Sequence, residues 1–202
     1  MTTKKLLIAV IALSIALVSV VGVTIAFLVD SQSVKNTFTY GDINIALEET
    51  PDTFKMIPGD YILKDPTVTV EGGSEVCWLF VKIEESDNFD DFMTYNVDTA
   101  VWNELKVDGV AIPGVYYLEL DEVYGETYFE DGVVKSDIDI PVLKKYENAN
   151  KEIYVLDTVT KEDLNAADFV APTLTFTAYA VQKANVNDVK TAWSIAEASA
   201  NS

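Results

Sequence analysis

The feature that most constrains this chain is an uncharged run of 24 residues, Leu6–Val29, which follows two lysines near the N-terminus. A short basic region, an apolar stretch and small side chains three and one positions before a cut are the parts of a secretory signal peptide. Thr24 and Ala26 supply the two small side chains, so cleavage is expected just before Phe27. Residues 1–26 are therefore predicted to form a hydrophobic signal helix that a signal peptidase removes.

An uncleaved membrane anchor is the alternative interpretation of the same run. A helix rises about 1.5 Å per residue, and a bilayer core of about 30 Å needs about 20 apolar residues. The run is therefore long enough to span a membrane. The small side chains at Thr24 and Ala26 favour cleavage instead, so a membrane contact is expected only through the uncleaved precursor.

Charge and missing residue types exclude several classes of function. The chain has 33 acidic and 14 basic residues and a net charge of −19. Nucleic-acid binding needs a cationic surface, so no nucleic-acid partner is expected. The sequence contains no histidine, which rules out a histidine-ligated zinc site and a Ser-His or Cys-His pair. No glycine-rich phosphate-binding loop occurs either, and we expect neither enzymatic activity nor a cofactor.

Cys77 is the only cysteine, so no disulfide can form within the chain. It lies in a segment, 75–83, in which side chains alternate so that Cys77 and Leu79 share one face while Trp78 and Phe80 share the other. We expect Cys77 to be a buried, unreactive thiol. Because the segment is apolar on both faces, it is either a fully covered central strand or a strand beside a hydrophobic groove.

The chain after residue 36 has a β pattern. Short segments rich in Val, Ile, Thr, Tyr and Phe are separated by glycine, proline and acidic turns. Asp108-Gly109 and Asp131-Gly132 carry the residue types of tight hairpin turns. The expected strands are 37–47, 67–70, 76–85, 95–101, 115–123, 134–142, 153–157 and 173–183.

Helical signals are few. Thr160 is a suitable N-cap for one short helix that runs to Asp168, and Asn187-Asp188 is suitable for another that turns Trp193 toward the sheet. No repeat or linker divides the region. We therefore predict one all-β domain over 37–202, an antiparallel jelly-roll-like β-sandwich with one or two short helices.

The densest group of acidic side chains lies in a predicted loop. Carboxylate oxygens on a loop are the ligands that Ca²⁺ prefers, although the spacing here matches no EF-hand. An ordinary acidic surface loop is the alternative. The candidate Ca²⁺ ligands are Asp87, Asp90 and Asp91.

Motifs at both ends of the chain resemble one known family, the exported proteins with a SipW-type signal peptide, which include the TasA and camelysin biofilm fibre proteins. The first motif reads Ala26-Phe27-x-x-Asp30-Ser31 and then Asn36-x-Phe38-x-x-Gly41-x-Ile43-x-Ile45-x-Leu47. The second combines Pro58-Gly59-Asp60 with Lys64-Asp65-Pro66. The third combines Thr177-Ala178-Tyr179-Ala180-Val181-Gln182 with Asp188 and Ala192-Trp193.

The resemblance implies a jelly-roll-like sandwich, cleavage by a SipW-type signal peptidase, and a structural role in the extracellular matrix or at the cell surface of a Gram-positive bacterium. It implies assembly by donor-strand complementation, in which the mature N-terminus of one subunit fills a groove in the next. The partners are then further copies of the chain and related matrix proteins. The implied donor is residues 27–36, with Phe27, Leu28, Val29 and Val34 as apolar anchors. Camelysins are also labelled metalloproteases, a label that the missing histidine contradicts here.

General physics agrees with part of this hypothesis. An extended segment adds to an exposed sheet edge through backbone hydrogen bonds, and a head-to-tail contact that does not close into a ring produces a filament. However, the donor is polar over 30–33, which leaves a disordered tail as the alternative. The alternative function is a monomeric, surface-associated β-sandwich that binds a glycan or a protein.

Overall fold

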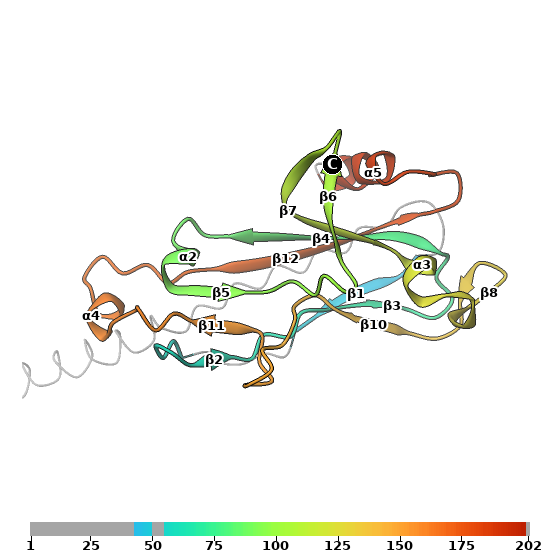
Figure 1. The fold of residues 1–202 in the computed structure, drawn as a ribbon. Coiled ribbons are helices and arrows are strands. Elements are labelled where there is room, and N and C mark those ends of the chain that lie inside the picture. Colours follow the sequence, from blue (N-terminus) through green and yellow to red (C-terminus); the bar gives the residue numbers. More distant parts are fainter. Residues whose placement is uncertain (1–42, 50–54, 201–202) are drawn as a thin grey trace, which may run out of the picture.

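A computed structural model describes residues 43–49 and 55–200 (Figure 1). The predicted signal peptide, its cleavage site at Thr24, Ala26 and Phe27, and the donor segment 27–36 lie outside these residues. Within the described part every strand pair is antiparallel. The predicted all-β, antiparallel fold class is therefore confirmed.

The strands form two layers (Figure 1). The upper layer in the figure is a four-stranded sheet in the order β12 (Leu174–Gln182), β4 (Cys77–Glu85), β7 (Val110–Glu119) and β6 (Asn103–Val107). Below it lie two three-stranded sheets. One has the order β1 (Ile45–Glu48), β3 (Thr67–Val70) and β10 (Ile138–Pro141). The other has the order β2 (Tyr61–Ile62), β11 (Ile153–Val155) and β5 (Met93–Tyr95).

The main hydrophobic core lies between these layers. Cys77, Leu79 and Val81 on one face of β4 have no exposed surface and belong to one cluster with Val68 and Val70 of β3. Each fully buried aliphatic side chain of this size stabilises the fold by roughly 1.5–3 kcal/mol relative to an exposed one. The core therefore supplies stability that no disulfide provides.

The other face of β4 is covered by the C-terminal helix α5 (Val189–Ala200). Trp193 of α5 lies with its ring centroid 5.3 Å from that of Phe80 and 5.8 Å from that of Tyr179. Trp78 is 6 % exposed and its indole N–H donates to the Val186 carbonyl at 3.0 Å. The covered-strand interpretation is confirmed, and the alternative of a hydrophobic groove at Trp78 and Phe80 is wrong.

The described residues contain four α-helices, more than the one or two that were predicted. Three of them have only four or five residues each: α2 (Phe89–Phe92), α3 (Leu120–Tyr124) and α4 (Lys161–Leu164). Thr160 caps α4 as predicted, in a capping box with Asp163. The predicted extension to Asp168 is wrong, because the chain continues in turns after Leu164.

Helix α5 confirms the second helix prediction. Asp188 accepts hydrogen bonds from the backbone N–H and the hydroxyl of Thr191, at 2.9 and 2.8 Å, and so caps the first turn. Ala192, Trp193 and Ala196 are the buried side chains of the helix. No helix within 43–49 and 55–200 is long and apolar enough to cross a membrane.

Both predicted hairpin turns are confirmed. Asp108 and Gly109 have φ angles of 53° and 81°, and Asp131 and Gly132 have φ angles of 51° and 81°. Positive φ at both central residues is the geometry of a type I′ turn, which matches the twist of paired strands. The first turn joins β6 to β7, and the second joins β8 (Phe129–Glu130) to β9 (Val133–Val134).

Several strand predictions need correction. The predicted strand 95–101 is wrong beyond Tyr95, because the Val101 and Trp102 N–H groups turn back to the Asp98 carbonyl. The predicted strand 134–142 is split, because Asp137 leaves the sheet to accept a hydrogen bond from the Gly72 N–H at 2.8 Å.

The predicted strand 115–123 is also shifted toward the N-terminus. It begins at Val110 and ends at Glu119, where α3 turns Leu120 into the core. Strand β6 was not predicted. Only Leu105 among its five residues is buried, so the segment has no alternating apolar pattern that would indicate a strand. The remaining predicted strands agree with β1, β3, β4, β11 and β12 to within a few residues over the described positions.

Gly114 provides a test of how closely β7 packs on β4. Its φ is +69°, and a Cβ at this position would lie 2.3 Å from the Ile83 carbonyl oxygen. We expect Gly114→Ala to lose about 1–2 kcal/mol of stability for the positive φ and about 1–3 kcal/mol more for the overlap. Gly109→Ala is the matched control, because Gly109 has a φ of +81° and nothing within 4 Å. Urea unfolding of both variants measures the difference, and equal losses would contradict the close contact.

Candidate functional site

Strand β1 is the first in the part of the chain that the structure describes, and its outer edge is a candidate site for strand addition. Among the described strands, β1 pairs only with β3. The Glu71 N–H donates to the Asn44 carbonyl, and the register pairs Ile45 with Val70. Asn44 therefore bonds toward β3. In an antiparallel pair successive residues bond alternately toward and away from the partner strand, so the backbone N–H and C=O groups of Ile45 and Leu47 point away from β3.

The side chains of Ile45 and Leu47 are 4 % and 7 % exposed. β1 also approaches β12, the edge strand of the other layer. A strand added at this edge would therefore extend the sheet directly beside the core.

The opposite edge of the same sheet is closed to further strands. In the register of β10 with β3, the backbone groups of Asp139 and Pro141 point away from β3, toward the outer edge of the sheet. Pro141 has no backbone N–H, and its carbonyl accepts a hydrogen bond from the Trp102 indole at 2.9 Å. Asp139 places an exposed carboxylate on the same edge. Proline and charge are the means by which proteins prevent strand addition. Among the described residues, the β10 edge carries such protection and the β1 strand does not.

The Lys-Asp-Pro motif holds the end of β1 in place. Lys64 is 8 % exposed, and its ammonium lies 2.6 Å from Oε1 of Glu49, the residue that follows β1. The backbone N–H of Lys64 donates to Glu152 Oε2 at 2.9 Å, and Glu152 is only 1 % exposed. Burial raises the pKa of the Glu152 carboxyl, and the hydrogen bond from Lys64 acts in the opposite direction. The motif therefore ties β1 to the start of β11.

The candidate calcium ligands do not assemble into a cluster. Asp87, Asp90 and Asp91 are exposed, and the last two lie in the first turn of α2. Over the described ranges no group of three His, Cys, Asp or Glu side chains is arranged to hold a metal ion.

Cys77 lies in the main core with no exposed surface, and burial raises the pKa of its thiol to about 12, with a smaller contribution from Asp121. The thiolate is the reactive form of cysteine. The protein therefore holds this group as an unreactive thiol at neutral pH.

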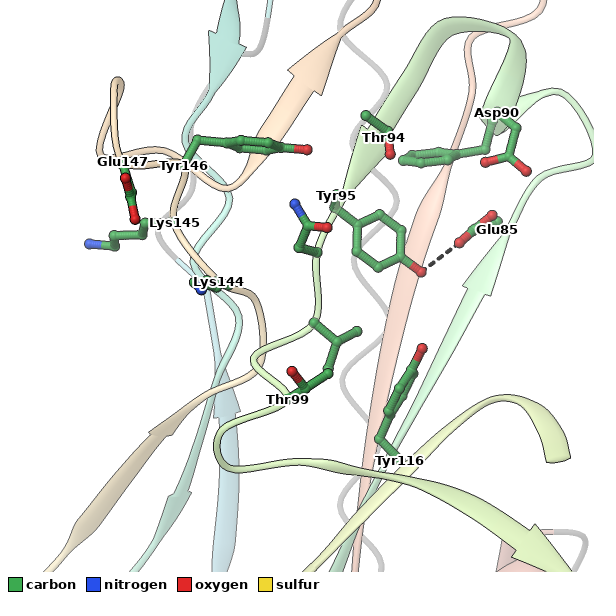
Figure 2. Close-up of a pocket in the computed structure, with 13 residues that line it drawn as sticks. Glu85, Asp90, Thr94, Tyr95, Thr99, Tyr116, Lys144, Lys145, Tyr146 and Glu147 are labelled. Carbon is green, nitrogen blue, oxygen red and sulfur yellow. Dashed lines mark hydrogen bonds between the residues drawn. The ribbon is translucent and has the colours of Figure 1, made fainter. Parts of the chain in front are cut away.

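A polar pocket that the sequence did not predict lies between the layers, with a volume of about 690 Å³ (Figure 2). Glu85 ends β4, Tyr95 ends β5 and Tyr116 lies on β7, while Tyr146 belongs to the loop after β10. The Tyr95 hydroxyl donates to Glu85 Oε1 at 2.5 Å. These residues are far apart in the sequence, and only the tertiary fold brings them together.

Over residues 43–49 and 55–200, the fold and these sites define an antiparallel β-sandwich protein with a strand edge, that of β1, on which no other described strand pairs, and with a polar pocket. The family model described as camelysin metallo-endopeptidase matches residues 1–111. This is more than half of the chain, and the chain belongs to this family. At the family level the match supports an exported, matrix-type protein. The searches of curated proteins and of solved structures gave no match.

The family description implies a metal, but the residues of this chain do not fit one. Catalytic zinc sites in proteases use histidine ligands, and the sequence has none. The single thiol is buried in the apolar core. The carboxylates described above do not converge on one point. We derive no metal-dependent step for this chain.

The state of Cys77 is testable by alkylation. We expect iodoacetamide at pH 8 to leave the native protein unmodified and to label it once in urea, because burial keeps the thiol protonated and inaccessible. Thr158→Cys is the control, because position 158 is exposed and its thiol should react in both states. Intact mass spectrometry counts the adducts. Rapid labelling of Cys77 in the native protein would contradict its burial.

Proposed function

We propose that the mature chain is a secreted structural subunit of an extracellular matrix fibre and that it polymerises head to tail through residues 27–36. The proposal includes no enzymatic activity. The observation that carries it is the family match, which spans the positions of the signal peptide, the donor segment and β1. The outer edge of β1, on which no other described strand pairs, supports it independently.

In the proposed contact, the donor of one subunit pairs with β1 of the next. Its backbone groups bond to those that Ile45 and Leu47 direct outward. Alternate side chains of a strand face opposite sides, so Phe27 and Val29 share the face that would enter the core. Leu28 and Val34 lie on the other face and would pack along the outer surface.

Cleavage of the signal peptide controls this assembly. While residues 1–26 remain attached, the donor is joined to an apolar helix that inserts into the membrane. Removal of that helix frees the donor at the mature N-terminus. Each subunit then carries one donor and one receiving edge, and repeated contacts of this kind form a filament because they do not close.

A monomeric surface domain that binds a glycan or a protein is the second candidate. The polar pocket favours it, since a pocket of this size is a binding feature that a purely structural subunit does not need. In this case residues 27–36 would pair within their own chain or stay unpaired. The oligomeric state of the mature protein separates the two candidates.

N-terminal sequencing of the secreted protein tests the first step. We expect it to begin at Phe27, because Thr24 and Ala26 are small enough for the peptidase pockets. Ala26→Lys should block cleavage and leave the chain in the membrane fraction. A protein that keeps residues 1–26 in wild-type cells would contradict the proposed donor.

Complementation between two variants tests the fibre contact. Deletion of 27–36 removes the donor and leaves the receiving edge, whereas Ile45→Pro keeps the donor and removes an outward N–H of β1. Each variant alone should remain monomeric in size-exclusion chromatography, and an equimolar mixture should form a heterodimer. Wild-type mature chain should form filaments in negative-stain microscopy.

Ile45→Ala is the matched control for the edge variant. It removes the buried side chain, which costs about 2–5 kcal/mol of stability, but it keeps the backbone N–H. We expect this variant to polymerise while Ile45→Pro does not. Filaments formed by the deletion variant would refute polymerisation through the donor. Filaments formed equally by Ile45→Pro would refute the assignment of the receiving edge to β1.

A further inference from the structure

We propose that the pocket between β4, β5, β7 and the loop after β10 binds a neutral oligosaccharide. This site is built from elements other than β1, and the inference does not depend on polymerisation. Its volume of about 690 Å³ lies within the range of about 300–1,000 Å³ that is typical of small-molecule sites. Two or three sugar rings fit a space of this size.

Three tyrosines form the walls of the pocket. Figure 2 shows the Tyr95 hydroxyl bonded to Glu85, Tyr116 below this pair with its hydroxyl pointing toward it, and Tyr146 on the opposite wall. Each ring is partly buried, so each presents an apolar face together with a polar hydroxyl. A sugar ring has the complementary surface, because its C–H groups lie on its faces and its hydroxyls lie around its edge. Tyrosine combines both kinds of contact in one rigid side chain.

The tyrosines are already held in position. Tyr95 is fixed by its hydrogen bond to Glu85 and by an edge contact with Phe89, whose ring centroid lies 5.7 Å away. The ring of Tyr146 lies 5.1 Å from that of Tyr61. Binding therefore costs little side-chain entropy, which favours a weakly interacting ligand such as a sugar. Burial raises the pKa of Tyr95, Tyr116 and Tyr146, so their hydroxyls remain neutral hydrogen-bond donors.

The polar groups of the lining distinguish a sugar from other ligands. Carboxylate, amide and hydroxyl groups at Glu85, Asn96 and Thr94 offer both acceptors and donors for sugar hydroxyls. Three acidic and two basic side chains line the pocket, so its charge is nearly balanced although the chain has a net charge of −19. A phosphate or nucleotide would require an excess of positive charge. Phe89 is the most deeply buried apolar residue of the lining. Because it is only 1 % exposed, its ring is not accessible to an apolar side chain of a peptide.

Calorimetric titration of the mature chain tests the inference with three probes: cellotetraose, maltotetraose and the tetramer of N-acetylglucosamine. We expect at least one of them to bind with a Kd of about 1 mM or tighter. Tyr116→Ala should weaken that binding about tenfold or more, because it removes a wall, and Tyr116→Phe should weaken it less. Circular dichroism verifies that both variants fold.

Two further variants separate the pocket from other surfaces. Asn96→Ala changes an exposed lining residue and should weaken binding while leaving filament formation unchanged. Tyr128→Ala removes a tyrosine that is 45 % exposed and does not line the pocket, and it should bind as wild type. The inference is wrong if none of the three probes binds. It is equally wrong if binding is unchanged in both Tyr116→Ala and Asn96→Ala, since the sugar would then bind elsewhere.

Discussion

The nine-residue pairing of β4 with β12 is the contact on which the rest of this structure depends. The register runs without interruption from Cys77 opposite Gln182 to Glu85 opposite Leu174. One face of this pair closes the main core, and the other face packs on α5. Because Cys77 is the only cysteine, no covalent cross-link can replace this packing. The Lys183 N–H continues the pairing by donating to the Val76 carbonyl at 3.0 Å, and the Lys183 side chain pairs with Glu119 at the end of β7 and with Asp121 of α3.

The edges of the sheets differ in how they are protected against the addition of further strands. The β10 edge is protected by Pro141 and by the Trp102 hydrogen bond to its carbonyl. The β6 edge carries exposed Glu104 and Lys106 at an irregularity in register. By contrast, β1 has the sequence Ile-Ala-Leu-Glu, with no proline and one charge at its end. Since unprotected edges promote association, this difference is the physical reason why a fibre contact at β1 is a reasonable proposal.

The sequence predicted those parts of the fold that depend on local rules. Alternation located β3, β4 and β12, and Asp-Gly pairs located both type I′ turns, because these patterns act over a few neighbouring residues. Strand β6 and the break at Asp137 were missed, because they depend on contacts with distant segments. The same reason applies to the pocket. Tyr95, Tyr116 and Tyr146 follow no spacing rule, and their proximity results from the packing of two layers.

The Lys-Asp-Pro motif was visible in the sequence, but its role depends on contacts with distant segments. The sequence identified it through a resemblance, but gave no reason for a lysine at that position. The structure supplies one, since the ammonium of the buried Lys64 side chain lies 2.6 Å from Oε1 of Glu49. A buried charge is stable only with a partner, so the identity of this residue depends on Glu49 at the end of β1. The hydrogen bond to Glu152 comes from the backbone N–H of Lys64 and would form with any residue except proline.

The proposed fibre contact and the proposed sugar pocket would also reinforce each other physically. A partly open pocket that relies on a few tyrosine contacts would bind a single glycan chain weakly. A filament repeats the same pocket at every subunit, and a long polysaccharide carries many copies of its sugar unit. Linked sites raise the overall affinity by a factor of about 10²–10⁴ without any new contact. A weak site on a monomer would therefore become a strong matrix cross-link on a polymer, and the two proposed activities would gain from being combined in one chain.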